Sequence, residues 1–392
     1  MKKTLIITLL LQIFNLSYSQ NSVLNEKLTI DSDILNEKRE IWIGLPTNYD
    51  STLSYPTIYV LDAEDQFDIT YAITKELAIN DKIPNHIVIG IPYVNPKKRI
   101  YDLSFTTNSF NSNGKPDSLI ATYFSNNLTG GGPNFLSYLS NEVVPLVNSI
   151  YSTNGFDIFI GHSASGYFGA YILTLKSPFE VFELYDPSIW YNNGDPIKHF
   201  SETFDKEIQV NVFISSANAG KERQQYNIDT HNDFHNQLLK HNINSELKIY
   251  EEGHSSVRLP SLIDGLSSLY KGYSIGTIVP TDTITVDDVF KHYLEFSKKV
   301  KFDFTPPAEA FRWTGYANHT QKKWKEAIKA YEACSNFYSN DLYMLLEFAD
   351  SYFNAEEYSK SLTIYKKILI LDKSNNNAKS RIEKIKRLTT KN

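Results

Sequence analysis

The stretch DIFIGHSASGYFGAY, at residues 157–171, places a serine where a reactive nucleophile would stand. An apolar run typical of a strand ends just before Ser163, and small residues typical of a tightly packed helix follow it. The pattern matches Gly-x-Ser-x-Gly, in which a strand turns sharply into a helix at the serine, except that Ser165 replaces the last Gly. Gly161 and Ala164 are small enough for that turn. The stretch therefore predicts Ser163 as a nucleophile for acyl chemistry.

A serine hydroxyl needs a base to take its proton, and the chain has nine histidines. Only His254, in ELKIYEEGHSS, follows a late apolar strand inside a tight turn. His231, His235 and His241 fall on or near a helical pattern, and we interpret them as surface residues. His254 is therefore the expected base.

The carboxylate that orients the base is expected between Ser163 and His254, after the penultimate strand, because hydrolases of this kind have the chain order Ser, acid, His. That strand is expected in VNVFIS, and the first carboxylate after it is Glu222. Asp229 and Asp233 are the alternatives. The sequence favours Glu222 as the acid.

Stabilising a developing oxyanion requires two backbone N–H donors. One is expected from Ala164, directly after the nucleophile. The other is expected from the turn after the early strand TIYVLDAED, at Ala63 or Glu64. Asp62 is interpreted as a residue that braces this turn, because it precedes the serine in the chain and follows the wrong strand for a catalytic acid.

Short apolar runs alternate with helical patterns over some 250 residues, which predicts a mostly parallel sheet with helices on both faces. The expected fold class is therefore α/β, with an all-α region after it. The central strands are expected in YPTIYVLDAED, HIVIGIP, DIFIGHS, FELYDPS, IQVNVFISS and ELKIYEEG.

The two ends of the chain differ from this pattern. Two lysines, an apolar run and small residues before Gln20 predict a secretory signal peptide at residues 1–19. A hydrolase domain is expected at 20–275, a linker with one helix at 276–306, and helical repeats at 307–392. The repeats have a period of 34, which pairs Trp324 with Tyr358, and they resemble tetratricopeptide repeats. We expect them to dock on the enzyme domain or on a protein partner.

Composition argues against several classes of function. The net charge of −6 and the lack of a basic stripe in the first 280 residues argue against nucleic-acid binding. There is no phosphate-binding loop and no pair of histidines at metal-ligand spacing, so neither cofactor nor metal is expected. No stretch after the signal peptide predicts a membrane span, so export to the periplasm or the medium is expected.

Several stretches together resemble the esterase family of α/β hydrolases that includes the enterochelin (siderophore) esterases. They include YPTIYVLDAEDQF, FIGHSASGYFGAY, YDPSIWYNN and YEEGHSSVRLPSLIDGL. The resemblance implies that Ser163 is the nucleophile, that His254, in a turn followed by Ser-Val, is the base, and that Glu222 occupies the acid position. It also implies an α/β-hydrolase fold and hydrolysis of carboxylic esters.

The chain departs from the family pattern at three positions. Ser165 replaces Gly, Asp186 stands where a Ser-Pro-Ser-Trp-Trp segment has its first Ser, and Tyr191 replaces the second Trp. Trp190, Tyr191 and His162 are expected to contact the substrate. The resemblance implies a small-molecule ester such as a siderophore or a feruloyl or acetyl sugar. The alternatives are an acyltransferase and an inert interaction protein that uses its repeats.

Overall fold

The computed structural model divides into two compact units, Met1–Ser268 and Leu269–Asn392. The expected signal peptide lies outside the described residues, and the expected domain limits stay predictions. No helix in the described part of the chain is long and apolar enough to span a membrane. The structure describes residues 26–47, 49–106, 129–203, 208–219, 222–275, 284–337 and 340–390.

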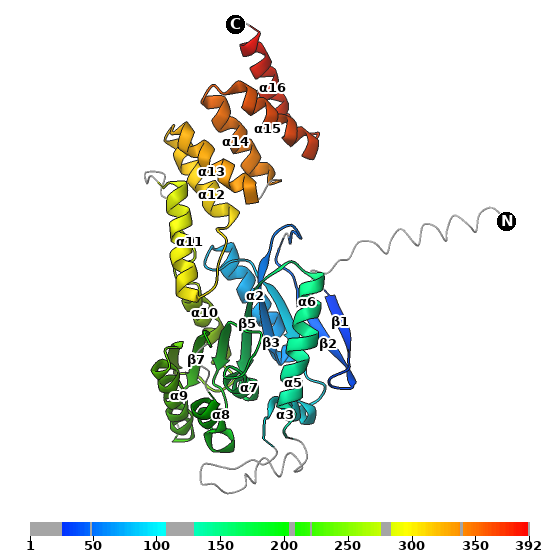
Figure 1. The fold of residues 1–392 in the computed structure, drawn as a ribbon, viewed down its shortest axis with the longest axis vertical. Coiled ribbons are helices and arrows are strands. Elements are labelled where there is room, and N and C mark those ends of the chain that lie inside the picture. The colour runs from blue at the N-terminus through cyan, green and yellow to red at the C-terminus, as the bar shows by residue number, and fades with distance from the viewer. Residues whose placement is uncertain are drawn as a thin grey trace, which may run out of the picture. The chain divides into compact units, whose positions relative to one another are not determined.

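The first unit is built on an eight-stranded sheet in the order β1-β2-β4-β3-β5-β6-β7-β8 (Figure 1). Strand β2 pairs antiparallel with β1 and with β4, and all other pairs are parallel. The strands are β1 (Glu26–Ser32), β2 (Glu37–Gly44), β3 (Tyr55–Leu61), β4 (Ile87–Ile91), β5 (Thr153–His162), β6 (Val181–Tyr185), β7 (Asn211–Ala217) and β8 (Asn244–Tyr250).

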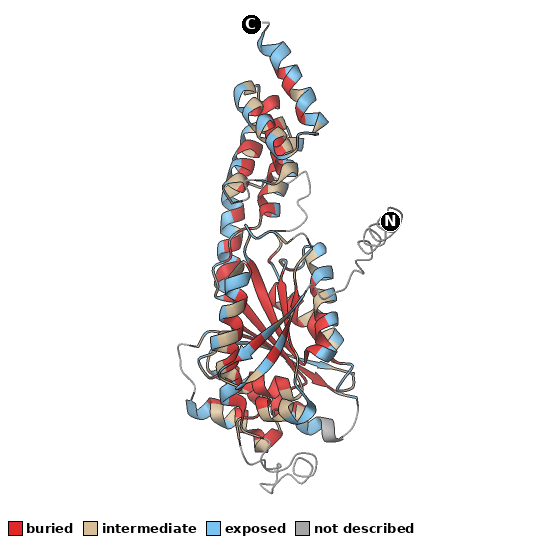
Figure 2. Cartoon of the chain, turned by 90° about the vertical axis from the view of Figure 1, so that its right-hand side faces the viewer, coloured by how far each residue is buried: buried red, intermediate tan, exposed pale blue. Residues whose placement is uncertain are grey.

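The central strands are buried over their whole length in β3, β4, β6 and β7. Continuous apolar strands are typical of parallel sheets that are covered on both faces. Figure 2 shows these buried strands between helices on either side. The predicted α/β-hydrolase fold is therefore confirmed.

Helices connect the strands and pack on them. Helix α2 packs on β3 and β4, α7 on β5 and β6, and α9 on β7 and β8. The helical segments of this unit are α2 (Ala63–Ile79), α3 (Pro96–Leu103), α5 (Gly132–Tyr138), the π-helical turn η1 (Leu139–Val143), α6 (Val144–Ile150), α7 (Ala164–Ile172), α8 (Tyr191–Thr203), α9 (Glu222–Lys240) and α10 (Arg258–Leu269).

A buried carboxyl group, Asp157, and a half-buried one, Glu180, lie together at one end of the sheet. Asp157 of β5 is 3% exposed, and its backbone N–H donates to Glu180 Oε2 over 2.8 Å. Burial, and then the nearby charge of Glu180, raise the pKa of Asp157 to about 8. Burial also raises the pKa of Glu180 to about 7. Both groups therefore hold protons in the folded state at pH values where the unfolded chain has released them.

This pair predicts a stability that falls as pH rises. Both pKa values are raised in the folded state, so folding takes up protons between about pH 4 and pH 8, and the free energy of unfolding decreases across that window. Asp157→Asn is expected to raise the free energy of unfolding at pH 8 by roughly 2–3 kcal/mol and to flatten the pH slope. Urea unfolding of the full chain at pH 5 and pH 8 measures both effects.

Asp229→Asn is the matched control, because Asp229 is an exposed carboxylate on α9. It is expected to keep the wild-type pH slope. An unchanged slope in Asp157→Asn would contradict the prediction.

The second unit is all-helical. Its helices are α11 (Val286–Val300), α12 (Ala308–Thr320), α13 (Trp324–Phe337), α14 (Leu342–Asn354), α15 (Tyr358–Leu371) and α16 (Asn376–Thr389). Helices α12 and α14 begin 34 residues apart, as do α13 and α15, which is the period expected from the sequence. A Cβ at Gly315 would lie 2.5 Å from the Tyr331 ring, so the repeat needs a small residue there. The tetratricopeptide assignment stays a prediction.

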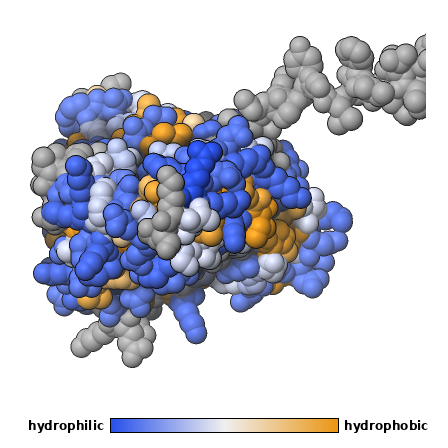
Figure 3. Space-filling model, turned by 90° about the horizontal axis from the view of Figure 1, so that it is seen from above, coloured by the Kyte–Doolittle hydropathy of each residue, from blue (hydrophilic) through white to orange (hydrophobic). Residues whose placement is uncertain are grey.

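The unit buries its aromatic residues unevenly. Tyr331 and Tyr365 are fully buried, whereas Trp313, Tyr316 and Tyr343 are exposed. On the face shown in Figure 3, hydrophilic residues predominate and hydrophobic ones form small separate areas. The three exposed aromatic residues lie together, because Trp313 and Tyr316 have ring centroids 6.0 Å apart and the Arg312 guanidinium lies 5.3 Å from the rings of both Trp313 and Tyr343.

Candidate active site

Ser163 occupies a strained turn between β5 and α7. Its φ of 61° and ψ of −117° lie outside the helical and strand regions, and a positive φ is unusual for a residue with a side chain. Its N–H donates to the Tyr185 carbonyl of β6 over 3.1 Å, and its own carbonyl accepts from the N–H of Ser188 over 2.9 Å. Such strain is kept only where the surroundings fix it, and here two segments outside the turn do so.

Glycines allow the close packing around this turn. A Cβ at Gly161 would lie 2.4 Å from the carbonyl oxygen of Ser165, and one at Gly166 would lie 2.8 Å from Cβ of Pro187. Ser165, at the remaining small position, is fully buried without such a conflict. The local sequence therefore fits the sharp turn that exposes a nucleophilic serine.

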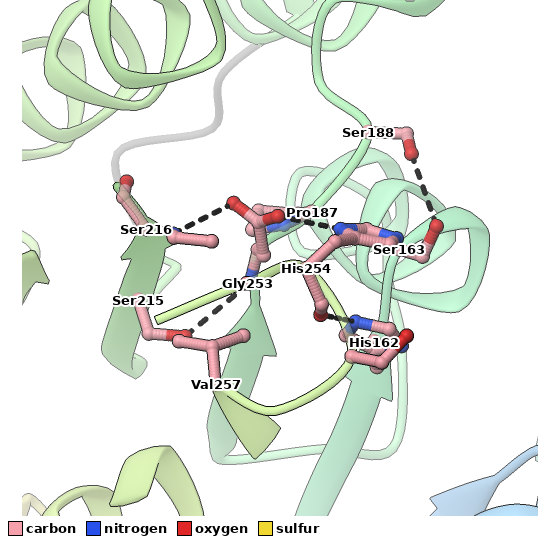
Figure 4. Close-up of polar contacts among 12 residues, drawn as sticks. His162, Ser163, Pro187, Ser188, Ser215, Ser216, Gly253, His254 and Val257 are labelled. Carbon is pink, nitrogen blue, oxygen red and sulfur yellow. Dashed lines mark hydrogen bonds and ion pairs between the residues drawn. The ribbon is translucent and has the colours of Figure 1, made fainter. Parts of the chain in front are cut away.

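His254 and Asp186 form a hydrogen-bonded pair beside this turn. His254 lies in the loop after β8, Asp186 directly follows β6, and Nδ1 of the histidine is 2.5 Å from Oδ2 of the aspartate. A carboxylate can only accept, so Nδ1 carries the proton and Nε2 is left with a free lone pair. In Figure 4 the ring of His254 points toward Ser163. The pair can therefore orient a neutral imidazole as a base.

The environment keeps Asp186 ionised. Its side chain is 1% exposed, against 48% for His254. Burial alone would raise the pKa of Asp186, but the hydrogen bonds from His254 and from the N–H of Ala217 outweigh it, so the pKa is lowered. The N–H of Asp186 also donates to the carbonyl of Ser215 over 2.9 Å. Strand β7 thus fixes the carboxylate through its backbone.

The Ser163 hydroxyl lies next to a second serine. Its Oγ is 3.4 Å from Oγ of Ser188, a contact drawn in Figure 4. This is the hydrogen-bond partner of the Ser163 hydroxyl among the described residues. The hydroxyl can reach another acceptor by rotation about its Cα–Cβ bond, because the long contact with Ser188 is weak.

His162 holds the main chain of His254. Its Nε2 is 2.6 Å from the carbonyl oxygen of His254, and the two rings lie with centroids 4.5 Å apart. Burial, and then the charge of His254, lower the pKa of His162 to about 4, so it is neutral near pH 7 and donates from Nε2. The expected contact between His162 and the substrate stays a prediction, because these two contacts of the His162 ring are with His254.

The two expected oxyanion donors both start helices. Ala63 is the first residue of α2 and Ala164 the first of α7. The first N–H groups of a helix have no partner within it and lie at the positive end of its dipole. Both are therefore suitable donors to a developing negative charge.

A metal is not implied by these residues. Among the described residues, no group of three or more His, Cys, Asp or Glu side chains is placed to hold a metal ion.

A family comparison agrees with this geometry. The family model described as Putative esterase matches residues 32–255, which is more than half of the chain. The chain belongs to this esterase family. It is a carboxylic ester hydrolase. No curated protein matches the chain.

Solved structures resemble this esterase. An IroE-like serine hydrolase from Shewanella oneidensis is 26% identical, with a TM-score of 0.68, over 80% of this chain and 99% of that one. A protein from Capnocytophaga ochracea is 17% identical, with a TM-score of 0.59, over 92% and 99%. A siderophore hydrolase, EstA, from Aspergillus nidulans is 19% identical, with a TM-score of 0.52, over 65% and 96%. The last two show the fold alone.

The carboxylate in contact with His254 is not the one expected. Asp186 makes this contact, where Glu222 was expected. Glu222 is the first residue of α9, and its side chain lies outside the described residues. The alternatives Asp229 and Asp233 are exposed on the same helix. The physical reason is position, because Asp186 leaves β6 at the same edge of the sheet as Ser163 leaves β5.

One histidine of the esterase is also placed differently from the expectation. His231 was expected on the surface, but it is fully buried. Its Nε2 is 2.6 Å from the carbonyl oxygen of Pro187, and its Nδ1 is 2.5 Å from Oγ of Ser216. It thereby fixes the segment that follows Asp186. Helical spacing alone could not reveal this, because α9 buries one face.

Trp190 and Tyr191 follow Ser188 within two or three residues. Trp190 is half-buried, whereas Tyr191 is 7% exposed, with its ring 5.1 Å from that of Tyr167. The next three residues, Asn192 to Gly194, all have left-handed backbone angles. Left-handed angles are costly for residues with a side chain and are tolerated best by Asn and Gly, which occupy these three positions.

Proposed function

We propose that the chain is an exported serine esterase in which Ser163 is the nucleophile, His254 the general base and Asp186 the acid. The observation that supports it most is the short Nδ1 contact between His254 and Asp186, beside a serine in a strained strand-to-helix turn. The chain order Ser163, Asp186, His254 is the order of α/β hydrolases.

In the proposed reaction, the Ser163 hydroxyl turns from Ser188 to Nε2 of His254 and attacks the ester carbonyl carbon as its proton passes to Nε2. The N–H groups of Ala63 and Ala164 stabilise the resulting oxyanion. The bond to the alcohol breaks, and His254 returns the proton to the leaving oxygen. Water then attacks the acyl-enzyme, with His254 again as base, and releases the acid and Ser163.

For the substrate, we propose a small-molecule carboxylic ester, such as a siderophore or a feruloyl or acetyl sugar. Support comes from the family and from the similar fold of a protein named as a siderophore hydrolase. Trp190, half-buried and close to Ser188 in sequence, is the proposed contact for the acyl or alcohol group. Hydrolysis rates over a panel of these ester classes would rank them.

Two further parts of the proposal rest on sequence. The Lys-rich start and apolar run at residues 1–19 support export to the periplasm or the medium. The 34-residue recurrence of helices in the second unit supports a role for those helices in docking a protein.

Covalent labelling tests the proposed mechanism. The full chain is treated with a fluorophosphonate probe, which reacts with an activated serine, and the labelled peptide is sequenced by mass spectrometry. We expect a single adduct on Ser163 in the wild type and none in Ser163→Ala. An unlabelled wild type would favour the inert interaction protein, and an adduct on another serine would overturn the assignment.

A further inference from the structure

Ser165 differs from the Gly expected at its position by a hydroxyl group that is fully buried. Its Oγ accepts from the N–H of His162 over 2.9 Å and lies 2.8 Å from Oδ2 of Asp62. The carbonyl of His162 is equally near, but a hydroxyl has one proton, and the carboxylate is the stronger acceptor. The hydroxyl therefore joins the nucleophile turn to the loop between β3 and α2.

Asp62 is held at the other end of this link. Nε of Arg99 lies 2.5 Å from Oδ1 of Asp62, and an end nitrogen of the guanidinium lies 2.7 Å from Oδ2. Two parallel bonds of this kind fix the carboxylate in direction as well as in distance. The Asp62 side chain is 8% exposed, so water screens the pair little.

The backbone of Asp62 shows that this arrangement is specific. Asp62 is the N-cap of α2, a position where aspartate usually accepts a bond from its own helix, but its side chain makes no such bond. It has left-handed angles, φ 53° and ψ 50°. The carboxylate is thus directed to Ser165 and Arg99, and the next residue, Ala63, begins the helix.

We propose that Ser165, Asp62 and Arg99 are positioning residues that hold the N–H groups of Ala63 and Ala164 at the separation an oxyanion requires. This inference rests on the proposed function, since both alanines are its oxyanion donors. Ala63 directly follows Asp62, and Ala164 directly precedes Ser165, so the Ser165–Asp62 hydrogen bond spans the gap between the two donors. The chain thus uses Ser165 for an interaction that Gly cannot make.

The expected effect follows from the geometry of transition-state stabilisation. Loss of one oxyanion donor costs about 10²–10³-fold in kcat, and a displaced donor costs part of that. Ser165→Ala keeps Cβ and removes the hydroxyl, so kcat for p-nitrophenyl acetate is expected to fall about 10–100-fold, with KM little changed. A fall in kcat alone would not show whether the two oxyanion donors have moved or the whole active site has become less ordered.

The decisive measurement compares p-nitrophenyl acetate with its thiono analogue, in which sulfur replaces the carbonyl oxygen. Sulfur is a weak hydrogen-bond acceptor, so the thiono ester gains little from the oxyanion donors. If the donors are displaced, Ser165→Ala loses rate on the oxygen ester and much less on the thiono ester, and the oxygen-to-thiono rate ratio falls about tenfold. Arg99→Gln, which removes the ion pair that holds Asp62, is expected to lower this rate ratio by a similar factor. The double variant Ser165→Ala/Arg99→Gln is expected to lower it no further than either single variant.

Ser261→Ala is the matched control. Ser261 is also fully buried and helical, but its hydroxyl bonds only to the Val257 carbonyl of its own segment. It is expected to keep the wild-type ratio. If Ser165→Ala and Arg99→Gln slow both esters by the same factor, the inference is overturned. A failure of the proposed function would give a different result, because Ser163→Ala would then hydrolyse both esters at the wild-type rate.

Discussion

Replacing Ser163 with alanine is expected to lower kcat for p-nitrophenyl ester hydrolysis by about 10⁶-fold. The substitution removes the only atom that forms the acyl-enzyme, while the oxyanion donors and the binding site remain. A small residual rate above that of water is therefore expected. Stopped or continuous absorbance assays of purified full-length protein measure it.

The strained backbone at this position makes a fold control necessary. Alanine has the same preference against positive φ as serine, so the melting temperature of the variant is expected to match that of the wild type. Ser188→Ala is the matched activity control, because its Oγ lies 3.4 Å from Oγ of Ser163 while its backbone N–H would be kept. It is expected to stay active, and wild-type rates in Ser163→Ala would refute the nucleophile.

Asp186→Asn is expected to lower kcat by about 10⁴-fold, with little change in KM. The amide has nearly the shape of the carboxylate, but its NH₂ group would face Nδ1 of His254. The ring would then carry its proton on Nε2 and could not accept one from Ser163. The loss of the negative charge also removes the stabilisation of a protonated His254.

Glu222→Gln is the comparison that decides between the two acids. It is expected to retain wild-type kcat, because Asp186 occupies the contact with His254. Steady-state kinetics of both variants with one ester give the answer. A large loss in Glu222→Gln together with a small loss in Asp186→Asn would return the acid role to Glu222.

The strands, the turn at Ser163 and the turn at His254 could be predicted from the sequence. Continuous apolar runs such as VFELY of β6 have few other interpretations once they alternate with helical patterns. Small residues around Ser163 and a tight turn at His254 are also local signals. These features can be read from the sequence because each depends only on residues that are close together in the chain.

Asp186 was missed for a physical reason. The sequence predicts the acid after the strand that precedes the histidine, whereas the carboxylate in contact with His254 follows β6, which pairs with β5. The signal was present, since Asp186 follows an apolar run as directly as Ser163 does. Whether the carboxylate after β6 or the one after β7 reaches His254 depends on the order of the strands in the sheet. No pattern of neighbouring residues in the sequence gives that order.

The sequence shows Ser165 only as a small residue where the family pattern has Gly. Space does permit it, but the contact with Asp62 joins residues 103 positions apart. Such a bond cannot be inferred from spacing along the chain. The same holds for His231, whose burial depends on the position of Pro187 in the neighbouring segment.

The position of Asp186 directly after β6 has an engineering consequence. The proposed acid and nucleophile leave adjacent strands, and β7 holds Asp186 through the backbone of Ser215 and Ala217 and the hydroxyl of Ser215. The connection from β7 to α9 then carries none of the proposed catalytic side chains. It is available for insertions or randomised loops that change which esters are accepted while the chemical machinery is left intact.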